Sequence, residues 1–452
     1  MAEYDQKVVE EIRAEYGTIN DYEMQRMINR MPKVMDIKET VLTYVNNDSL
    51  KRLQRATGDK NKLFYDEEYA KTTRYGTRIA PPAFYYGVFW GSWDFRRGEG
   101  FPGVHGLNCG DRMLFLRPLY DGDHVSCTKQ EYAIIEKQGK WAGRSLLQME
   151  RVHITNQKGE LVFKEYYPAI RGERKKAEKK GKYHEIPVGK YTKEDIEKFD
   201  NYLRTQENGG DNGRTWESVN VGDETYTYCR GPLTVADEIC FLEGVNAPHC
   251  RTGLDWLEYR ERSPKIAVPD PESGIPEAVE RVHWDSFMAR EIGMPAAYDY
   301  GAMRGAWATM FAANWVGDNG WLAEMELAYR MMNFIGDVTM IKGKVVNKWI
   351  GKKSGTHYVD VEFHSMNQRG EDSMPGWFTA ALPTKDEPLQ FPIDAEADRG
   401  GDPAPTDFYG PVAVEKARKK GQLICCADYL DEIDTTKYTI PEGYVRPEKI
   451  EF

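Results

Sequence analysis

A histidine and an aspartate two residues apart, His283 and Asp285, have side chains that could move a proton. An unperturbed imidazole titrates near neutrality, and a carboxylate close to it can orient a water molecule, so the two together suit general acid–base chemistry. A lone histidine is more often a surface or core residue that only makes hydrogen bonds. The pair therefore gains weight only from the elements that position it.

The chain carries one pattern twice. Segments 84–93 and 298–307 match at a Tyr-Gly pair, a second glycine and a tryptophan, and each matched pair is 214 residues apart. The motif Asn-Gln-x-Gly-Glu recurs at 156–160 and 367–371 with an offset of 211 residues. Several matches in one register indicate a tandem duplication. Residues that differ between the copies then show which copy carries the chemistry.

The periodicity of both copies predicts the same elements. A buried helix should be followed by long antiparallel strands, which favours an α+β fold with a sheet wrapped around a central helix. In the first copy we expect the helix at 83–93 and strands at 113–116, 125–136, 143–155 and 161–170. In the second copy we expect the helix at 301–315 and strands at 339–349, 356–365 and 376–382.

These elements divide the chain into five parts. We expect an N-terminal helical arm over 1–36, a first repeat over 37–172, a linker over 173–218, a second repeat over 219–385 with an insertion at 245–280, and an acidic tail over 386–452. Ser49 could cap a helix that ends at Gly58, and the tail should hold one helix at 412–420.

The composition excludes several kinds of partner. The 452 residues carry a net charge of -11, with 40% hydrophobic and 29% charged residues, as in a globular protein. We therefore expect no nucleic acid and no membrane as partners. The seven cysteines show no CxxC pair or metal-ligand spacing, which favours reduced thiols, a cytoplasmic setting and no metal. We recognise no signal peptide in the charged N-terminus and no apolar run of about 18 residues.

The segment Gly58–Asp66 resembles the signature of the MaoC-like acyl dehydratases, also called the hydratase 2 or (R)-specific enoyl-CoA hydratase family. That signature reads Gly-Asp-x-Asn-Pro-x-His-x-Asp. The first copy keeps most of it but has Lys62 at the proline and Phe64 at the histidine. Because phenylalanine cannot transfer a proton, we expect this copy to be structural. The resemblance covers 37–385 without the linker and insertion, and it implies a double hot-dog fold.

In the second copy, His283-x-Asp285 followed by Ala289 matches the end of the signature. The resemblance implies that His283 is the catalytic acid–base group, with Asp285 beside it. The upstream half of the signature is displaced, and 243–249 looks like a distorted version of it.

That displaced half leaves the catalytic carboxylate open. Glu243 is the first candidate and Glu280 the second, and His249 rivals His283 as the histidine.

The approach to the second central helix completes the expected site. By resemblance, backbone N–H groups near Tyr298 and Gly301 hold the thioester carbonyl oxygen, as a helix N-terminus can. Alternatively, Gly301 only allows close packing. Asp299 and Arg304 replace uncharged residues of the first copy, and an ion pair between them that shapes the site is favoured over contact of Arg304 with substrate carboxylate or phosphate.

Together these features predict the reversible hydration of an enoyl-CoA, with coenzyme A only as part of the substrate and no other cofactor. A basic cluster at 175–180 is either a coenzyme A contact or a solvated linker. The aromatic cluster of 84–93 is either packed core or a pocket for the acyl group. A hot-dog thioesterase and a non-catalytic acyl-binding subunit remain alternatives, and a second copy of the chain could complete a homodimer.

Overall fold

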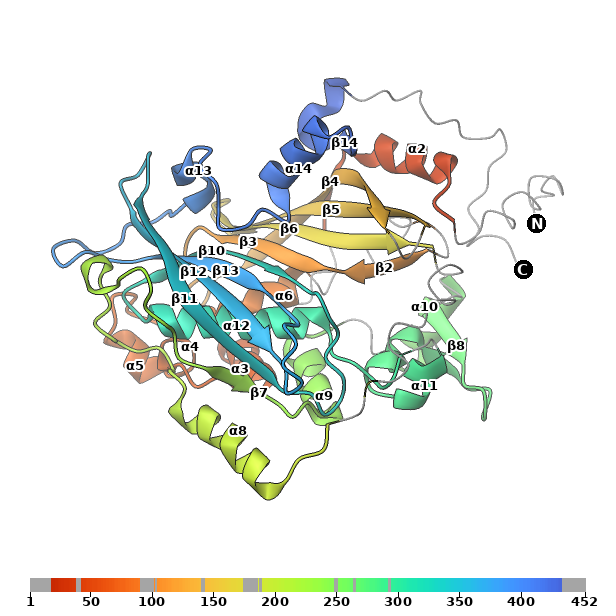
Figure 1. Ribbon diagram of the computed structural model, residues 1–452, viewed down its shortest axis with the longest axis horizontal. Helices are drawn as coiled ribbons and strands as arrows, with labels where there is room; N and C mark the ends of the chain where they lie inside the picture. The colour runs from red at the N-terminus through yellow and green to blue at the C-terminus, as the bar shows by residue number, and fades with distance from the viewer. Residues whose placement is uncertain are drawn as a thin grey trace.

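The computed structural model describes residues 18–37, 42–89, 101, 104–139, 143–173, 186, 189–247, 251–262, 266–291 and 294–432. One antiparallel sheet runs through both halves of the chain (Figure 1). The first half contributes β1 (Val34–Asp36), β2 (His105–Asn108), β3 (Gly110–Phe115), β4 (Val125–Gly139), β5 (Gly143–Asn156) and β6 (Leu161–Gly172). The second half contributes β7 (Tyr228–Arg230), β10 (Trp321–Ala328), β11 (Thr339–Ile350), β12 (His357–Met366) and β13 (Gly376–Ala381).

The two halves join edge to edge. The strand order is β1-β4-β5-β6-β3-β10-β13-β12-β11-β7, so β3 and β10 form the seam. Both halves have a β-bulge at the same place, between Glu131 and Ala133 in β4 and between Val345 and Asn347 in β11. These positions are 214 residues apart, which agrees with the duplication inferred from sequence. The strands expected in both copies are confirmed, whereas β7 and β10 were not expected.

Two central helices lie at the core of the molecule (Figure 1). Helix α12 (Gly301–Val316) is apolar on every side and almost all of its residues are buried, so it is stabilised by packing rather than by an amphipathic face. It ends at Gly317, whose φ of 76° stops the helical hydrogen-bond ladder. Helix α6 (Phe84–Phe89) is its counterpart, and all six of these residues are buried.

A second pair of equivalent helices packs beneath them, α3 (Asn47–Thr57) and α9 (Val235–Gly244). A Cβ on Gly244 would lie 2.3 Å from the Cβ of Ala56, so this glycine allows the close contact. Thr234 caps α9. Asn46 caps α3, and Ser49 is the third residue of that capping box rather than the cap expected from sequence.

The remaining helices lie outside this core. They are α2 (Asp21–Arg30), α4 (Lys62–Tyr65), α5 (Glu67–Lys71), α8 (Lys193–Thr205), η3 (Trp216–Ser218), α10 (Gly253–Arg262), η5 (Val279–His283), α11 (Ser286–Glu291), α13 (Ala395–Arg399), α14 (Gly410–Lys419) and η6 (Ala427–Glu432). The insertion forms α10 and a small hairpin of β8 (Ala267–Pro269) and β9 (Pro276–Ala278). Within the described residues no helix has the length and apolar character needed to cross a bilayer.

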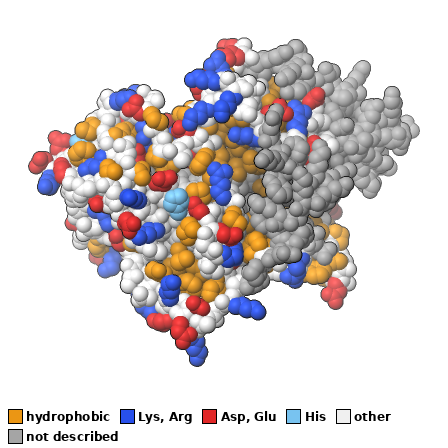
Figure 2. All heavy atoms as spheres, in the orientation of Figure 1, with side chains coloured by type: hydrophobic (Ala, Val, Ile, Leu, Met, Phe, Trp, Pro, Cys, Tyr) orange, Lys and Arg blue, Asp and Glu red, His pale blue; other side chains and the backbone are white. Residues whose placement is uncertain are grey.

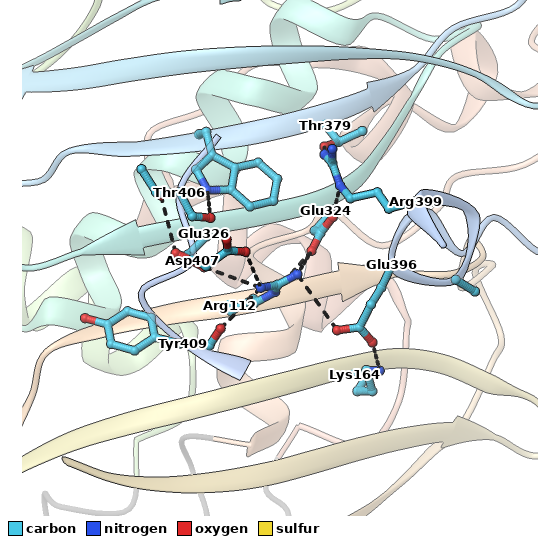
Figure 3. Close-up of polar contacts among 12 residues, drawn as sticks. Arg112, Lys164, Glu324, Glu326, Thr379, Glu396, Arg399, Thr406, Asp407 and Tyr409 are labelled. Carbon is cyan, nitrogen blue, oxygen red and sulfur yellow. Dashed lines mark hydrogen bonds and ion pairs between the residues drawn. The ribbon is translucent and has the colours of Figure 1, made fainter. Parts of the chain in front are cut away.

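The C-terminal segment is part of the fold, not an extended tail. Its strand β14 (Leu423–Cys426) pairs with β4, at the first-repeat end of the sheet. Its carboxylates also enter a buried ion network on the outer side of the seam (Figure 3). There Arg112 of β3 pairs with Glu324 of β10 at 2.7 Å, and Asp407 of the tail lies 3.7 Å from the same guanidinium.

The surface carries both signs of charge. On the face shown in Figure 2, Lys and Arg side chains are interspersed with Asp and Glu side chains in the described part. The described cysteines are free thiols, as the sequence predicts.

Candidate functional site

The imidazole of His283 lies directly before the start of α12. Its Nδ1 is 2.7 Å from the carbonyl oxygen of Tyr298, and its ring stacks on Tyr300 with centroids 3.8 Å apart. A carbonyl can only accept, so Nδ1 carries the hydrogen and Nε2 keeps a free lone pair. Loss of water around the ring lowers its pKa to about 4. At neutral pH the imidazole is therefore an uncharged base.

A carboxylate that the sequence reasoning missed, Glu238, lies against the same segment. It is fully buried on α9, and neither of its oxygens has a hydrogen-bond partner among the described residues. Burial and then the charge of Asp299 raise its pKa well above the usual range, whereas the backbone of Tyr300 and the charge of Arg304 lower it by less. Glu238 is therefore a neutral acid at physiological pH.

The expected carboxylate, Glu243, is not at this place. It is exposed on α9. Five helical residues turn the chain by about 500°, so Glu243 points roughly 140° away from Glu238. The correction follows from helical phase, which the distorted signature did not reveal. Glu280, the second candidate, is buried one 3₁₀ turn before His283, and burial raises its pKa to about 7.

Asp285 has a local structural task. Its Oδ1 accepts hydrogen bonds from the N–H of Phe287 at 2.7 Å and of Met288 at 3.3 Å, which caps α11. Its Oδ2 pairs with Arg281 at 2.6 Å. Both oxygens are thus engaged away from the imidazole. The rival His249 and the basic cluster 175–180 lie outside the described residues.

The first turn of α12 presents unpaired donors. No hydrogen bond is found for the N–H groups of Gly301 and Ala302 within the described part of the chain, and Tyr300 provides no side-chain cap. These groups carry the partial positive charge of the helix N-terminus, which suits a developing oxyanion. Gly301 also packs closely, because a Cβ there would lie 2.9 Å from Cε2 of Tyr329.

The first copy has closed its equivalent donors. The N–H of Phe84 bonds to the carbonyl of Pro81 at 2.9 Å, and that of Tyr86 bonds to Ala83 at 3.3 Å. Phe64, at the position of the family's histidine, is buried. The start of α6 therefore offers neither a base nor free donors.

The conserved part of the first signature instead holds the far end of α12. Asn314 donates to Asp59 at 2.6 Å and accepts from Asn61 at 2.9 Å, and all three side chains are buried. A partly open apolar pocket of about 450 Å³ lies beside them, with Phe64 and Tyr85 in its wall. Its α12 residues are at the C-terminal end, roughly 22 Å from Gly301 by the helical rise.

Asp299 and Arg304 form the expected ion pair. Oδ2 of Asp299 is 2.5 Å from Nε of Arg304, and both side chains are buried. The guanidinium also donates to the carbonyl oxygens of Met331 and Ser373. Because protein groups occupy Arg304, it shapes the approach to α12 and is not placed to bind a substrate anion. In the described residues, no cluster of His, Cys, Asp or Glu is arranged to hold a metal.

Comparison with known proteins agrees with this architecture. The sequence model of a FAS1-like dehydratase domain region matches residues 35–165. No curated protein sequence matches the chain. A solved MaoC-like dehydratase is similar over 79% of this chain and 99% of its own, with 15% identity and a TM-score of 0.54. A putative MaoC domain dehydratase from Chloroflexus aurantiacus covers 79% and 96%, with 10% identity and a TM-score of 0.51.

The fold is therefore the MaoC-like double hot-dog, as the sequence resemblance implied. One site in it, at the start of α12, combines a neutral imidazole, a buried carboxylic acid and free N–H donors.

Proposed function

We propose that the chain is a lyase that reversibly hydrates an enoyl-CoA thioester to a 3-hydroxyacyl-CoA. The observation that carries the proposal is the neutral imidazole of His283, held 2.7 Å from the carbonyl of Tyr298 and three residues before the free N–H of Gly301. The family matches support a dehydratase of this general kind.

The N–H groups of Gly301 and Ala302 would hold the thioester carbonyl oxygen. When the C2–H bond breaks, its electron pair moves toward that oxygen and forms an enolate. Donors fixed before the reaction stabilise this charge without reorganising, and removing one such donor typically costs about 10²–10³ in rate.

His283 and Glu238 would divide the proton transfers. In dehydration, Nε2 of His283 takes the proton from C2, and the carboxylic acid of Glu238 protonates the departing hydroxyl at C3, which leaves as water. The resulting imidazolium and carboxylate neutralise each other's charge. Hydration runs the same steps backwards. Glu280 is the alternative acid, because it precedes His283 by one 3₁₀ turn.

The experiment is to incubate the protein with crotonyl-CoA and with 3-hydroxybutyryl-CoA and to follow gain or loss of water by mass spectrometry. His283→Ala should lower kcat by about 10²–10⁴. His364→Ala is the matched control, because His364 also bonds to an aspartate, Asp372, but is exposed on β12.

Equal activity of the two variants would contradict the proposal. Release of free coenzyme A thiol instead of water exchange would indicate a thioesterase. Binding without any turnover would indicate a non-catalytic acyl-binding subunit.

A further inference from the structure

The inner face of the first-repeat sheet is polar where the same face of the second repeat is apolar. Seven matched pairs show this: Asp111 and Met325, Lys129 and Gly343, Glu131 and Val345, Gln148 and Val359, Glu150 and Val361, Glu165 and Gly376, Tyr167 and Phe378. The strand registers confirm the match, because Glu131, Glu150 and Tyr167 lie across from one another. Val345, Val361 and Phe378 do the same in the second repeat.

All seven side chains of the first repeat are buried. Their second-repeat equivalents belong to the apolar core that surrounds α12. A duplicated sheet does not need polar groups on this face to fold, since its other copy folds without them. Buried polar groups are costly unless they are paired, so this exchange calls for a ligand or a compensating network.

Compensation inside the protein is incomplete at one end of this face. Tyr86 and Tyr329 donate to Oδ2 of Asp111 at 2.9 Å and 2.6 Å, but Oδ1 has no hydrogen-bond partner in the described residues. Neither oxygen of Glu165 has one. Both carboxyl groups are fully buried, and of the seven positions only Lys129 carries a positive charge.

This unsatisfied end lies next to the proposed reaction site. The ring of Tyr329 covers Gly301, and its hydroxyl reaches Asp111. A Cβ on Gly305 would lie 2.0 Å from the hydroxyl of Tyr86 and 2.6 Å from that of Tyr329. One tyrosine ring therefore separates the N–H donors of α12 from the first carboxyl group of the polar face.

We propose that this face receives the acyl group of the thioester held at Gly301, and that this acyl group carries a hydrogen-bond donor, a hydroxyl or an amino group, that binds Asp111 and Glu165. The inference rests on the proposed function for the thioester end of the substrate. A purely apolar acyl chain would leave the same carboxyl oxygens buried and unpaired, which is the strongest available form of discrimination against it.

Equilibrium binding of saturated thioesters tests this without turnover, because they have no double bond to hydrate. Isothermal titration calorimetry would compare butyryl-CoA with its ω-hydroxy and ω-amino analogues. The wild-type protein should bind at least one analogue about tenfold more tightly than butyryl-CoA. Glu165→Gln and Asp111→Asn should abolish that preference, whereas Glu362→Gln, an exposed carboxyl group on β12, should retain it.

Butyryl-CoA binding as tightly as both analogues would overturn the inference, and so would a preference that survives both inner-face variants with unchanged unfolding midpoints. Failure of the proposed function is a separate outcome. Donor preference without water exchange would reject hydration alone, and hydration of crotonyl-CoA without donor preference would reject the polar acyl group alone. The hydroxy and amino arms distinguish the two donors.

Discussion

At the scale of single residues, the environment of the site sets two protonation states that ordinary side chains would not have. Burial lowers the pKa of His283 to about 4, and burial with the charge of Asp299 raises that of Glu238. Both groups are then neutral at pH 7, one able to accept a proton and the other able to donate one. Paired shifts of this kind are typical of acid–base sites.

These shifts predict a bell-shaped dependence of dehydration on pH. The rate should rise as pH increases through about 4, where His283 loses its proton and becomes a base. It should fall at higher pH, where Glu238 ionises and can no longer donate. Glu238→Gln should lower kcat by about 10²–10⁴ and remove the alkaline limb. A larger effect of Glu280→Gln on the same kcat–pH curve would assign the acid to Glu280 instead.

At the scale of elements, the two central helices show how one duplicated unit acquired two roles. Helix α12 begins with free N–H donors beside a histidine, whereas α6 begins with donors already bonded and a phenylalanine nearby. The remnant of the first signature now fixes the other end of α12 through Asn314. The degenerate copy thus helps to hold the helix that its partner uses.

The glycines of α12 and α6 give a prediction at this scale. Gly301→Ala should lower kcat/KM at least tenfold, because its Cβ would push the Tyr329 ring from 2.9 Å. Gly87→Ala is the matched change on α6, where a Cβ would lie 2.5 Å from Leu42. It should cost about 1–3 kcal/mol of stability but leave kcat/KM of the folded protein near wild type. Urea unfolding and steady-state kinetics measure both, and an equal kinetic loss would deny the donor role of Gly301.

At the scale of the whole molecule, the seam between the repeats is held by charges that the C-terminal segment covers. Arg112 and Arg399 share a buried network with Glu324 and Asp360, and Glu396 of the tail lies 3.8 Å from Arg112 (Figure 3). A pairing between two strand edges would otherwise leave these carboxylates without compensation. The tail therefore stabilises the joined sheet.

Arg112→Met should lower the free energy of unfolding by about 3–5 kcal/mol, because Glu324 would lose its 2.7 Å partner inside the protein. Arg204→Met is the control, since Arg204 is exposed on α8 and its ion pair with Glu197 should contribute no more than about 1 kcal/mol. Denaturant unfolding of both variants measures the difference. Similar losses would show that the seam network is not a main source of stability.

Repetition and periodicity were readable along the chain because they are local or depend on fixed offsets. They predicted the α+β double hot-dog, most strands and both central helices, and they pointed to His283, Gly301 and the Asp299–Arg304 pair. The tail was misread as an extension, because strand pairing between β14 and β4 joins segments almost 300 residues apart and leaves no local signal.

The sequence by itself determined that a module was duplicated and that only the second copy kept a histidine before its central helix. Only the tertiary structure decided which carboxyl group accompanies that histidine and what the first repeat presents on its inner face. The physical reason is that a pattern along one element does not show what that element packs against. Glu238 and Glu243 lie on one helix, yet α9 buries the first against α12 and turns the second to solvent.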